Sequence, residues 1–524
     1  MSSPGCGEGQ RRLRARAFLT LTFGGAIVAA GLTARGFAPQ TEPVSPEAIR
    51  IDVRAPAHPF PHFWEQVMGS ARASLSLRES YRRDLRTVKA ATALEYVRFH
   101  AIFQDENGIY DEDIQGRPVY NFTYVDQIYD GLLEAGVRPF VELSFMPKKL
   151  AASQAPHPFW YNPLPSPPKD YGKWGDLIHE FAAHLVARYG LDEVAQWYFE
   201  VWNEPNLDFW SGEPKEEAYD KLYETTSRAL KGVSPRLRVG GPATAQAAWV
   251  DRFIRVCVDR NVPIDFVSTH VYANDRSEDV FGTSDKIDRS DMVARAVRKV
   301  HDQVKRSARP NLPIHWTEYN ASYMNELEVT DSPFMGPWLA NNIRQCDVLT
   351  DAMAYWTFSD VFEEQGVAKT PFYGGFGLIA VGGIPKASFN AFQLLHQLGT
   401  ERIPSDSPSV IATRRPDGGL VLALWNYAPP GEQGGSRDLR VQFTGVSGNR
   451  RMLIHRLDAN HGSALTAWRA MGSPSFPTRE QQRDLRRSAQ MAAPEQRMFD
   501  AGKESGTTVT LPPHGLVLIE LLSR

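Results

Sequence analysis

The sequence predicts an α/β protein: a (β/α)8 TIM barrel followed by an additional all-β, sandwich-like domain. Two observations support this prediction. Between residues 62 and 399, eight short apolar runs alternate with eight longer helical patterns. From residue 400 to residue 524, short strand-like runs separated by turns replace that alternation.

The eight apolar runs have the length and the β-branched and aromatic content of buried strands. They cover 63–71, 94–100, 137–144, 196–204, 237–242, 264–272, 312–320 and 352–360. The helical patterns cover 79–92, 124–136, 171–190, 215–233, 247–261, 291–308, 337–351 and 385–399. Several of them end in glycine, which suits a left-handed C-terminal cap. Eight strand–helix units in series predict a closed parallel barrel.

The C-terminal part begins with a predicted hairpin, in which 410–413 and 420–425 flank a turn at 417–419. Further strands are expected at 439–443, 451–457 and 516–521, and 466–497 is interpreted as a surface excursion of charged helical turns. One more strand-like run, 48–54, lies in the segment 39–61. Because it exceeds the barrel count of eight, we expect it to pair with the β domain.

The composition of the 524-residue chain is that of a globular protein, with 42% hydrophobic and 23% charged residues. A net charge of −3 argues against nucleic acid or an anionic membrane as a partner, and nothing indicates the oligomeric state. Of the cysteines, Cys257 and Cys346 are expected to be buried free thiols. No metal-ligand spacing occurs, so the sequence predicts no metal and no cofactor.

The first 38 residues have the features of a secretory signal peptide: a basic region at 11–16, an apolar run at 18–33 and small residues at 34–38. Arg11 and Arg12 would allow a twin-arginine signal, and an uncleaved anchor is the alternative. We therefore expect export to the periplasm or the exterior, without stable membrane association after cleavage.

Two predicted barrel strands end in a glutamate, Glu204 after the fourth strand and Glu318 in the seventh. A carboxylate at the tip of a buried strand is costly unless it faces a cleft or pairs with a cation or a helix N-terminus. Chemistry in barrels of this kind lies at the C-terminal ends of the strands. Two carboxylates about 5–5.5 Å apart across such a cleft are the apparatus of a retaining glycosidase.

The run FEVWNEPN at 199–206 resembles the acid/base signature of glycoside hydrolase family 39, which includes β-xylosidases and α-L-iduronidases. The likeness spans roughly residues 60–400 and rests on further motifs: YVRFH at 96–100, DFVSTHVY at 265–272, TE at 317–318, WTFSDVFEE at 356–364, GGFGL at 374–378 and IPK at 384–386. The later motifs resemble the bacterial β-xylosidase branch more than the iduronidase branch, whose signature has Asp where this chain has Asn206. Tyr319 departs from the Trp of many relatives.

The resemblance implies that Glu204 is the general acid/base and Glu318 the nucleophile. It also implies a set of sugar-binding residues, with Asn203 on the 2-hydroxyl, His270 and Tyr272 on the nucleophile side, and His100, Tyr323, Trp356 and Glu363 in the pocket. Alternatives remain for some of them. The histidines could be buried and satisfied by backbone, Trp356 could belong to the core, and at most one of the adjacent Glu363 and Glu364 should face the sugar.

The predicted function is therefore a retaining, exo-acting β-xylosidase on short xylosides or xylo-oligosaccharides, by a double displacement between two glutamates. One alternative is the same chemistry on another glycone, such as an arabinoside, a galactoside or a bacterial exopolysaccharide. Another is a carbohydrate-binding protein without catalytic activity, which the intact pair of glutamate motifs argues against.

Overall fold

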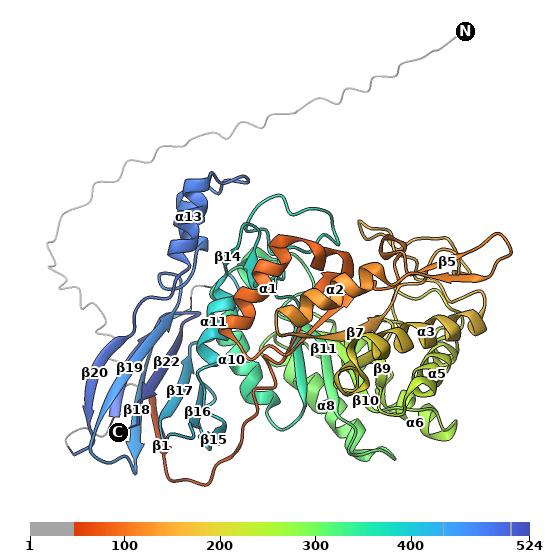
Figure 1. The fold of residues 1–524 in the computed structure, drawn as a ribbon. Helices are drawn as coiled ribbons and strands as arrows, with labels where there is room; N and C mark the ends of the chain where they lie inside the picture. The colour runs from red at the N-terminus through yellow and green to blue at the C-terminus, as the bar shows by residue number, and fades with distance from the viewer. Residues whose placement is uncertain (1–46, 433, 503–505, 524) are drawn as a thin grey trace, which may run out of the picture. The chain divides into compact units, whose positions relative to one another are not determined.

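The computed structural model describes residues 47–432, 434–502 and 506–523, so the predicted signal peptide and Cys6 lie outside the described residues. Eight parallel strands close into a barrel in chain order, which confirms the predicted fold class (Figure 1). The barrel strands are β3 (Val67–Arg72), β4 (Tyr96–His100), β7 (Arg138–Leu143), β8 (Tyr198–Val201), β9 (Arg238–Thr244), β10 (Phe266–Tyr272), β11 (Ile314–Asn320) and β12 (Ala352–Tyr355).

A long helix accompanies each predicted strand–helix unit. These helices are α1 (Glu79–Ala91), α2 (Thr123–Glu134), α3 (Tyr171–Tyr189), α5 (Lys215–Val233), α6 (Val250–Asp259), α8 (Met292–Arg306), α10 (Met335–Cys346) and α11 (Ala387–Leu395). Helix α3 shows why they form. The Asp170 side chain caps its first turn by accepting from the amides of Gly172 and Lys173, and Trp174, Ile178 and the residues spaced with them form a buried stripe.

The β domain consists of two sheets. One has the order β1 (Glu47–Asp52), β18 (Arg437–Thr444), β21 (Gly506–Leu511). The other has the order β2 (His58–Pro59), β15 (Glu401–Ile403), β16 (Val410–Arg414), β17 (Leu420–Trp425), β22 (Leu516–Leu521), β19 (Asn449–Leu457), β20 (Glu495–Asp500). Apolar side chains of both sheets share one core, including Ile51, Val441, Leu422 and Ile519. The run at 48–54 forms β1, which pairs in parallel with β18 beside the C-terminal strands (Figure 1).

Four strands of this domain, β2, β15, β20 and β21, were not predicted from the sequence. The strand β20 runs EQRMFD, in which only Phe499 is buried, and β21 is rich in threonine. Neither shows a run of alternating apolar residues, because β20 buries a single residue and one of the three alternating buried positions of β21 is Thr507. The excursion at 466–497 does contain helices, α12 (Leu465–Ala470) and α13 (Arg479–Ser488), but its last residues belong to β20.

The barrel contacts the β domain through α10. Gly336 of this helix lies so close to the sheet that a Cβ atom there would stand 3.3 Å from side-chain atoms of both Leu457 and Leu516.

Cys257 and Cys346 are buried free thiols, as predicted. Among the described residues, no helix has both the length and the apolar character needed to cross a bilayer.

A buried lysine links the loops that follow β11 and β12. The Lys386 ammonium lies 2.6 Å from a carboxylate oxygen of Asp331 and 2.6 Å from one of Asp360, and it donates to the Gly375 carbonyl at 2.9 Å. All three charged side chains are fully buried. The two carboxylates raise the pKa of Lys386 above its usual value although burial opposes this, so the lysine stays charged.

Replacing this lysine should destabilise the fold. In Lys386→Met two carboxylates remain buried without a cation, and we expect the free energy of unfolding to fall by about 3–5 kcal/mol. Urea unfolding followed by tryptophan fluorescence measures it. The matched control is Arg117→Gln, which breaks the exposed pair with Asp113 and should change stability by less than about 1 kcal/mol. Equal unfolding midpoints for the two variants would contradict the assignment.

Candidate active site

A cavity of about 390 Å³ lies at the C-terminal ends of the barrel strands. It is the place where the fold predicts chemistry. Seven of the nine predicted site residues line it: His100, Asn203, Glu204, Tyr272, Glu318, Tyr323 and Trp356. The remaining two, His270 and Glu363, lie behind the lining, in different surroundings that are described below.

Glu204 follows β8 at a sharp turn of the backbone. Its φ is +42°, in the left-handed region, and its amide donates to the Ala243 carbonyl at 2.8 Å. Strain of this kind persists where surrounding contacts hold the residue, and it is common in active sites. The turn aims the carboxyl group into the cavity, where only 10% of the side chain is exposed.

Glu318 lies on β11 and is held through both of its oxygens. Arg98 Nη1 donates to Oε1 at 2.8 Å, and the Tyr272 hydroxyl donates to Oε2 at 2.6 Å. Charge-assisted hydrogen bonds of this length fix the orientation of a carboxylate. A carboxylate oxygen of Glu318, one of Glu204 and a ring nitrogen of His270 all lie within 4.8 Å of one another. This closeness fits the short separation of a retaining glycosidase and leaves no room for a water behind the sugar.

His270 lies between the two glutamates. It is near the nucleophile, to which the resemblance assigned it, with Nδ1 at 3.7 Å from Glu318 Oε1, but its shorter contact is with the acid/base. Its Nδ1 lies 2.9 Å from Glu204 Oε1 and its Nε2 lies 3.1 Å from Thr317 Oγ1. The Thr317 hydroxyl donates to Glu200 Oε1 at 2.7 Å, so it accepts from a hydrogen on His270 Nε2. Burial lowers the pKa of His270 well below its usual value, so the ring is neutral. Its Nδ1 is then an acceptor, and the partner that can donate to it is protonated Glu204.

The electrostatics of Glu204 agree with this hydrogen-bond chain. Burial, and then the negative charge of Glu318, raise the pKa of Glu204 well above the usual carboxyl range. A group with a raised pKa keeps its proton at neutral pH and loses it as the pH rises. Glu204 is therefore prepared to act as a general acid.

Arg98 of β4 is the cation at the centre of the site. Its side chain is fully buried and contacts three carboxylates: Glu200 at 2.6 Å, Glu142 at 2.8 Å and Glu318 at 2.8 Å. It also donates to Asn203 Oδ1 at 2.9 Å, which orients that side chain at the cavity wall.

His100 shares the carboxylate of Glu142, with its Nδ1 at 2.6 Å from Oε2. Burial alone would lower the pKa of His100, but the carboxylates around it, Glu142 first and then Glu364 and Glu318, together outweigh burial and raise it. The His100 ring also lies 4.8 Å from the ring of Trp356, which lines the cavity. Trp356 has this place because Gly69 of β3 lacks a side chain: a Cβ there would stand 2.2 Å from the indole.

The two adjacent glutamates after β12 have different surroundings. Glu363 pairs with the guanidinium groups of Arg72 and Arg78 and does not line the cavity, contrary to its predicted role in binding sugar. Glu364 lines the cavity instead, 3.5 Å from His100 Nε2. Burial raises the pKa of Glu364 to about 8, so at neutral pH it can donate a hydrogen bond to a sugar hydroxyl.

Sequence reasoning missed several residues of the cavity. They include Phe159, Phe209, Gln246, Asp275 and Phe376, whereas Glu364 is one of the two glutamates between which the sequence left the choice open. Most come from long loops without a periodic pattern, so nothing in the sequence places them at the cavity. Tyr319, the departure from the family pattern, faces away from the cavity and stacks on Trp338 of α10 with ring centroids 6.0 Å apart. The support behind Glu318 is therefore aromatic, as it would be with tryptophan.

Comparison with known proteins agrees with this site. The family model of the glycosyl hydrolases of family 39 matches residues 47–506. A β-xylosidase of Geobacillus stearothermophilus is 37% identical over 476 residues, which cover 88% of this chain and 93% of that protein. The human α-L-iduronidase is 24% identical over 461 residues, covering 77% of this chain and 67% of that protein.

Solved structures show the same architecture. The crystal structure of a monomeric β-xylosidase from Caulobacter crescentus superposes with a TM-score of 0.83 and 34% identity, covering 91% of this chain and 99% of that one. A family 39 enzyme from Xanthomonas axonopodis pv. citri also has a TM-score of 0.83, with 32% identity and coverage of 93% and 100%.

The hydrogen-bond chain through Thr317 should control the pH dependence. Thr317→Val removes the acceptor for His270 Nε2, which favours the tautomer that donates from Nδ1 to ionised Glu204. The pKa of Glu204 should then fall, and the basic limb of kcat/KM against pH should move about one unit lower. The control is Thr269→Val, a buried threonine whose hydroxyl donates to the Thr244 carbonyl. An unmoved basic limb in Thr317→Val would refute the chain.

Substitutions at Glu363 and Glu364 should have different effects: loss of Glu363 should lower stability, and loss of Glu364 should lower activity. Glu364→Ala removes a cavity group that contacts substrate, and we expect kcat/KM to fall about 10- to 100-fold at an unchanged unfolding midpoint. Glu364→Gln should retain more activity because an amide also donates. Glu363→Ala leaves Arg78 without its carboxylate and Arg72 with Glu106 alone, and it should lower the free energy of unfolding by about 1–3 kcal/mol. The reverse pattern would restore Glu363 to the sugar pocket.

Proposed function

Because the chain belongs to the glycosyl hydrolases of family 39, which are retaining glycosidases, we propose that it is an exo-acting β-xylosidase that removes xylose from short xylosides. The observation that carries this proposal is the pair of glutamates in the cavity: Glu204 is hydrogen-bonded to His270, and Glu318 accepts from Arg98 and Tyr272. A double displacement requires a protonated acid and a nucleophilic carboxylate, and the raised pKa of Glu204 suits it to the first of these roles.

In the first step, the Glu318 carboxylate attacks the anomeric carbon of the bound sugar while Glu204 gives its proton to the departing glycosidic oxygen. A covalent glycosyl-enzyme forms and the aglycone leaves. In the second step, ionised Glu204 takes a proton from a water molecule while the oxygen of that water attacks the same carbon. The bond to Glu318 breaks, and Glu318 leaves as a carboxylate. Two inversions at one carbon give a product with the original anomeric configuration.

The cavity supports a short, uncharged sugar. Its volume of about 390 Å³ is near the lower end of the ~300–1,000 Å³ found for small-molecule sites, which favours a chain end over the interior of a polysaccharide. Its lining includes Glu364 and Asp275 but neither lysine nor arginine. A uronide would bring a carboxylate into these acidic surroundings without a lysine or arginine to pair with, so a neutral glycone such as xylose fits better.

A panel of aryl glycosides tests the proposal. We expect the aryl β-D-xyloside to have the highest kcat/KM, exceeding the β-D-glucoside by about 10- to 200-fold because the latter adds a hydroxymethyl group. The α-L-arabinoside and the β-D-galactoside should also be slower. Proton NMR early in the reaction should show β-xylose as the first-formed sugar. A faster arabinoside or galactoside would reassign the glycone, and the absence of hydrolysis of every member would leave a binding protein.

A further inference from the structure

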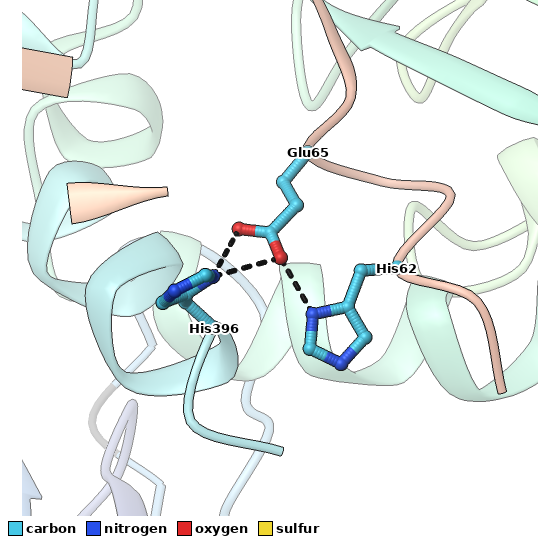
Figure 2. A group of neighbouring side chains, drawn as sticks. All are labelled: His62, Glu65 and His396. Carbon is cyan, nitrogen blue, oxygen red and sulfur yellow. Dashed lines mark hydrogen bonds and ion pairs between the residues drawn. The ribbon is translucent and has the colours of Figure 1, made fainter. Parts of the chain in front are cut away.

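Two histidines and a glutamate meet in one cluster (Figure 2). It lies at the N-terminal end of β3, whereas the active site lies at the C-terminal ends of the barrel strands. His62 and Glu65 precede β3, and His396 is the residue that ends α11. Although 331 positions separate His396 from Glu65, both imidazoles point at the same carboxylate (Figure 2). Neither histidine contacts the cavity of the active site.

The three side chains have the spacing of metal ligands. His62 Nδ1 lies 2.6 Å from Glu65 Oε1, and His396 Nδ1 lies 3.0 Å from each of the two oxygens of Glu65. One ligand atom from each residue can be chosen so that all lie within 4.8 Å of one another. Ligand atoms around a tetrahedral zinc ion, with bonds of about 2.0–2.1 Å, are about 3.3 Å apart. The nitrogen–oxygen contacts of 2.6 and 3.0 Å would lengthen by about 0.7 and 0.3 Å to admit the ion.

The surroundings hold these ligands in place. The His62 ring stacks on Trp64 with centroids 4.5 Å apart, and the second oxygen of Glu65 accepts from the Ala93 amide at 3.1 Å. Such outer contacts orient metal ligands. The Glu65 side chain is fully buried, whereas 37% of His396 is exposed. The exposed side gives an ion access and leaves a position for water.

The donor set indicates which ion fits. Two imidazoles and one carboxylate are ligands that zinc and similar divalent transition metals prefer, whereas calcium and magnesium prefer oxygen. One protonated histidine is enough to neutralise the charge of Glu65. An ion pair alone therefore does not explain why both His62 and His396 contact this carboxylate. Sequence spacing could not reveal this group, because the ligands come from the two ends of the barrel sequence.

We propose that His62, Glu65 and His396 bind a zinc ion that fastens the segment entering the first barrel strand to the end of the last barrel helix. This is the seam at which the barrel closes. The strands β12 and β3 share a single paired register position there, Tyr355 with Met68, whereas the other neighbouring barrel strands pair over three or more positions. A metal that binds only the folded chain stabilises that seam.

The test uses the whole chain, stripped with EDTA and titrated with zinc chloride. Isothermal titration calorimetry should show one zinc ion bound per chain. At a free zinc concentration 100-fold above the dissociation constant, the equilibrium constant for folding should rise about 100-fold. His62→Gln and His396→Gln should each lose the zinc-dependent rise in unfolding midpoint. His184→Gln is the matched control: it also breaks a half-buried histidine–carboxylate contact, of 2.6 Å to Asp126, but offers no second imidazole.

Three results would overturn the proposal. One is that zinc does not bind the unmodified chain or does not raise its unfolding midpoint. The three side chains would then form histidine–carboxylate ion pairs without a metal. Another is that the His62 and His396 variants respond to zinc as the unmodified chain does. A third is that Glu204→Gln abolishes the zinc response, because Glu204, His270 and Glu318 also lie within ligand distance of one another. If a histidine variant does not fold, the visible absorption of bound Co²⁺ in the unmodified chain reports imidazole ligation directly.

Discussion

A single buried cation, Arg98, organises the interior of the barrel at its catalytic end. Its guanidinium group lies on β4 and reaches carboxylates on three other strands: Glu142 on β7, Glu200 on β8 and Glu318 on β11. Removing charges from water is favourable only when they are paired and hydrogen-bonded, and arginine has five donors in a rigid fork to do this. The barrel can bury these three carboxylates because the guanidinium group of Arg98 lies among them and pairs with each. The same contact that stabilises the interior therefore also aims the nucleophile.

One arginine cannot neutralise all the acids around it, and the excess determines where protons reside. Glu142 is also paired with His100, and these two partners lower its pKa although burial opposes them. Glu204 has no such close cation, so burial and the charge of Glu318 raise its pKa. For Glu364, burial raises the pKa although His100 lies 3.5 Å away and opposes this. The protonated acid required for catalysis is thus a consequence of charge balance in a dry cleft, and the neutral His270 supplies the acceptor that the proton needs.

The fold and the pair of catalytic glutamates could be predicted from the sequence because both leave local signals. A buried strand is an apolar run, and Glu204 and Glu318 each interrupt such a run with a charge. The edge strands β20 and β21 leave no such signal, since β20 buries only Phe499 and one of the three buried positions of β21 holds a threonine. Nor could a motif decide between Glu363 and Glu364, because the answer depends on Arg72 and Arg78, almost 300 positions away. The cluster of His62, Glu65 and His396 could not be predicted from residue spacing for the same reason, because 331 positions separate Glu65 from His396.

The coupling between the two glutamates also explains how one residue serves as acid and then as base. While Glu318 is ionised, its charge is the largest influence after burial that raises the pKa of Glu204. Formation of the glycosyl-enzyme turns Glu318 into a neutral ester, so this influence disappears at the moment when Glu204 has lost its proton. The pKa of Glu204 then falls, which keeps it ionised while water enters. Hydrolysis of the ester restores the charge of Glu318 and with it the raised pKa. The protonation cycle is therefore driven by the covalent step itself, and it depends on the short distance between the two carboxylates.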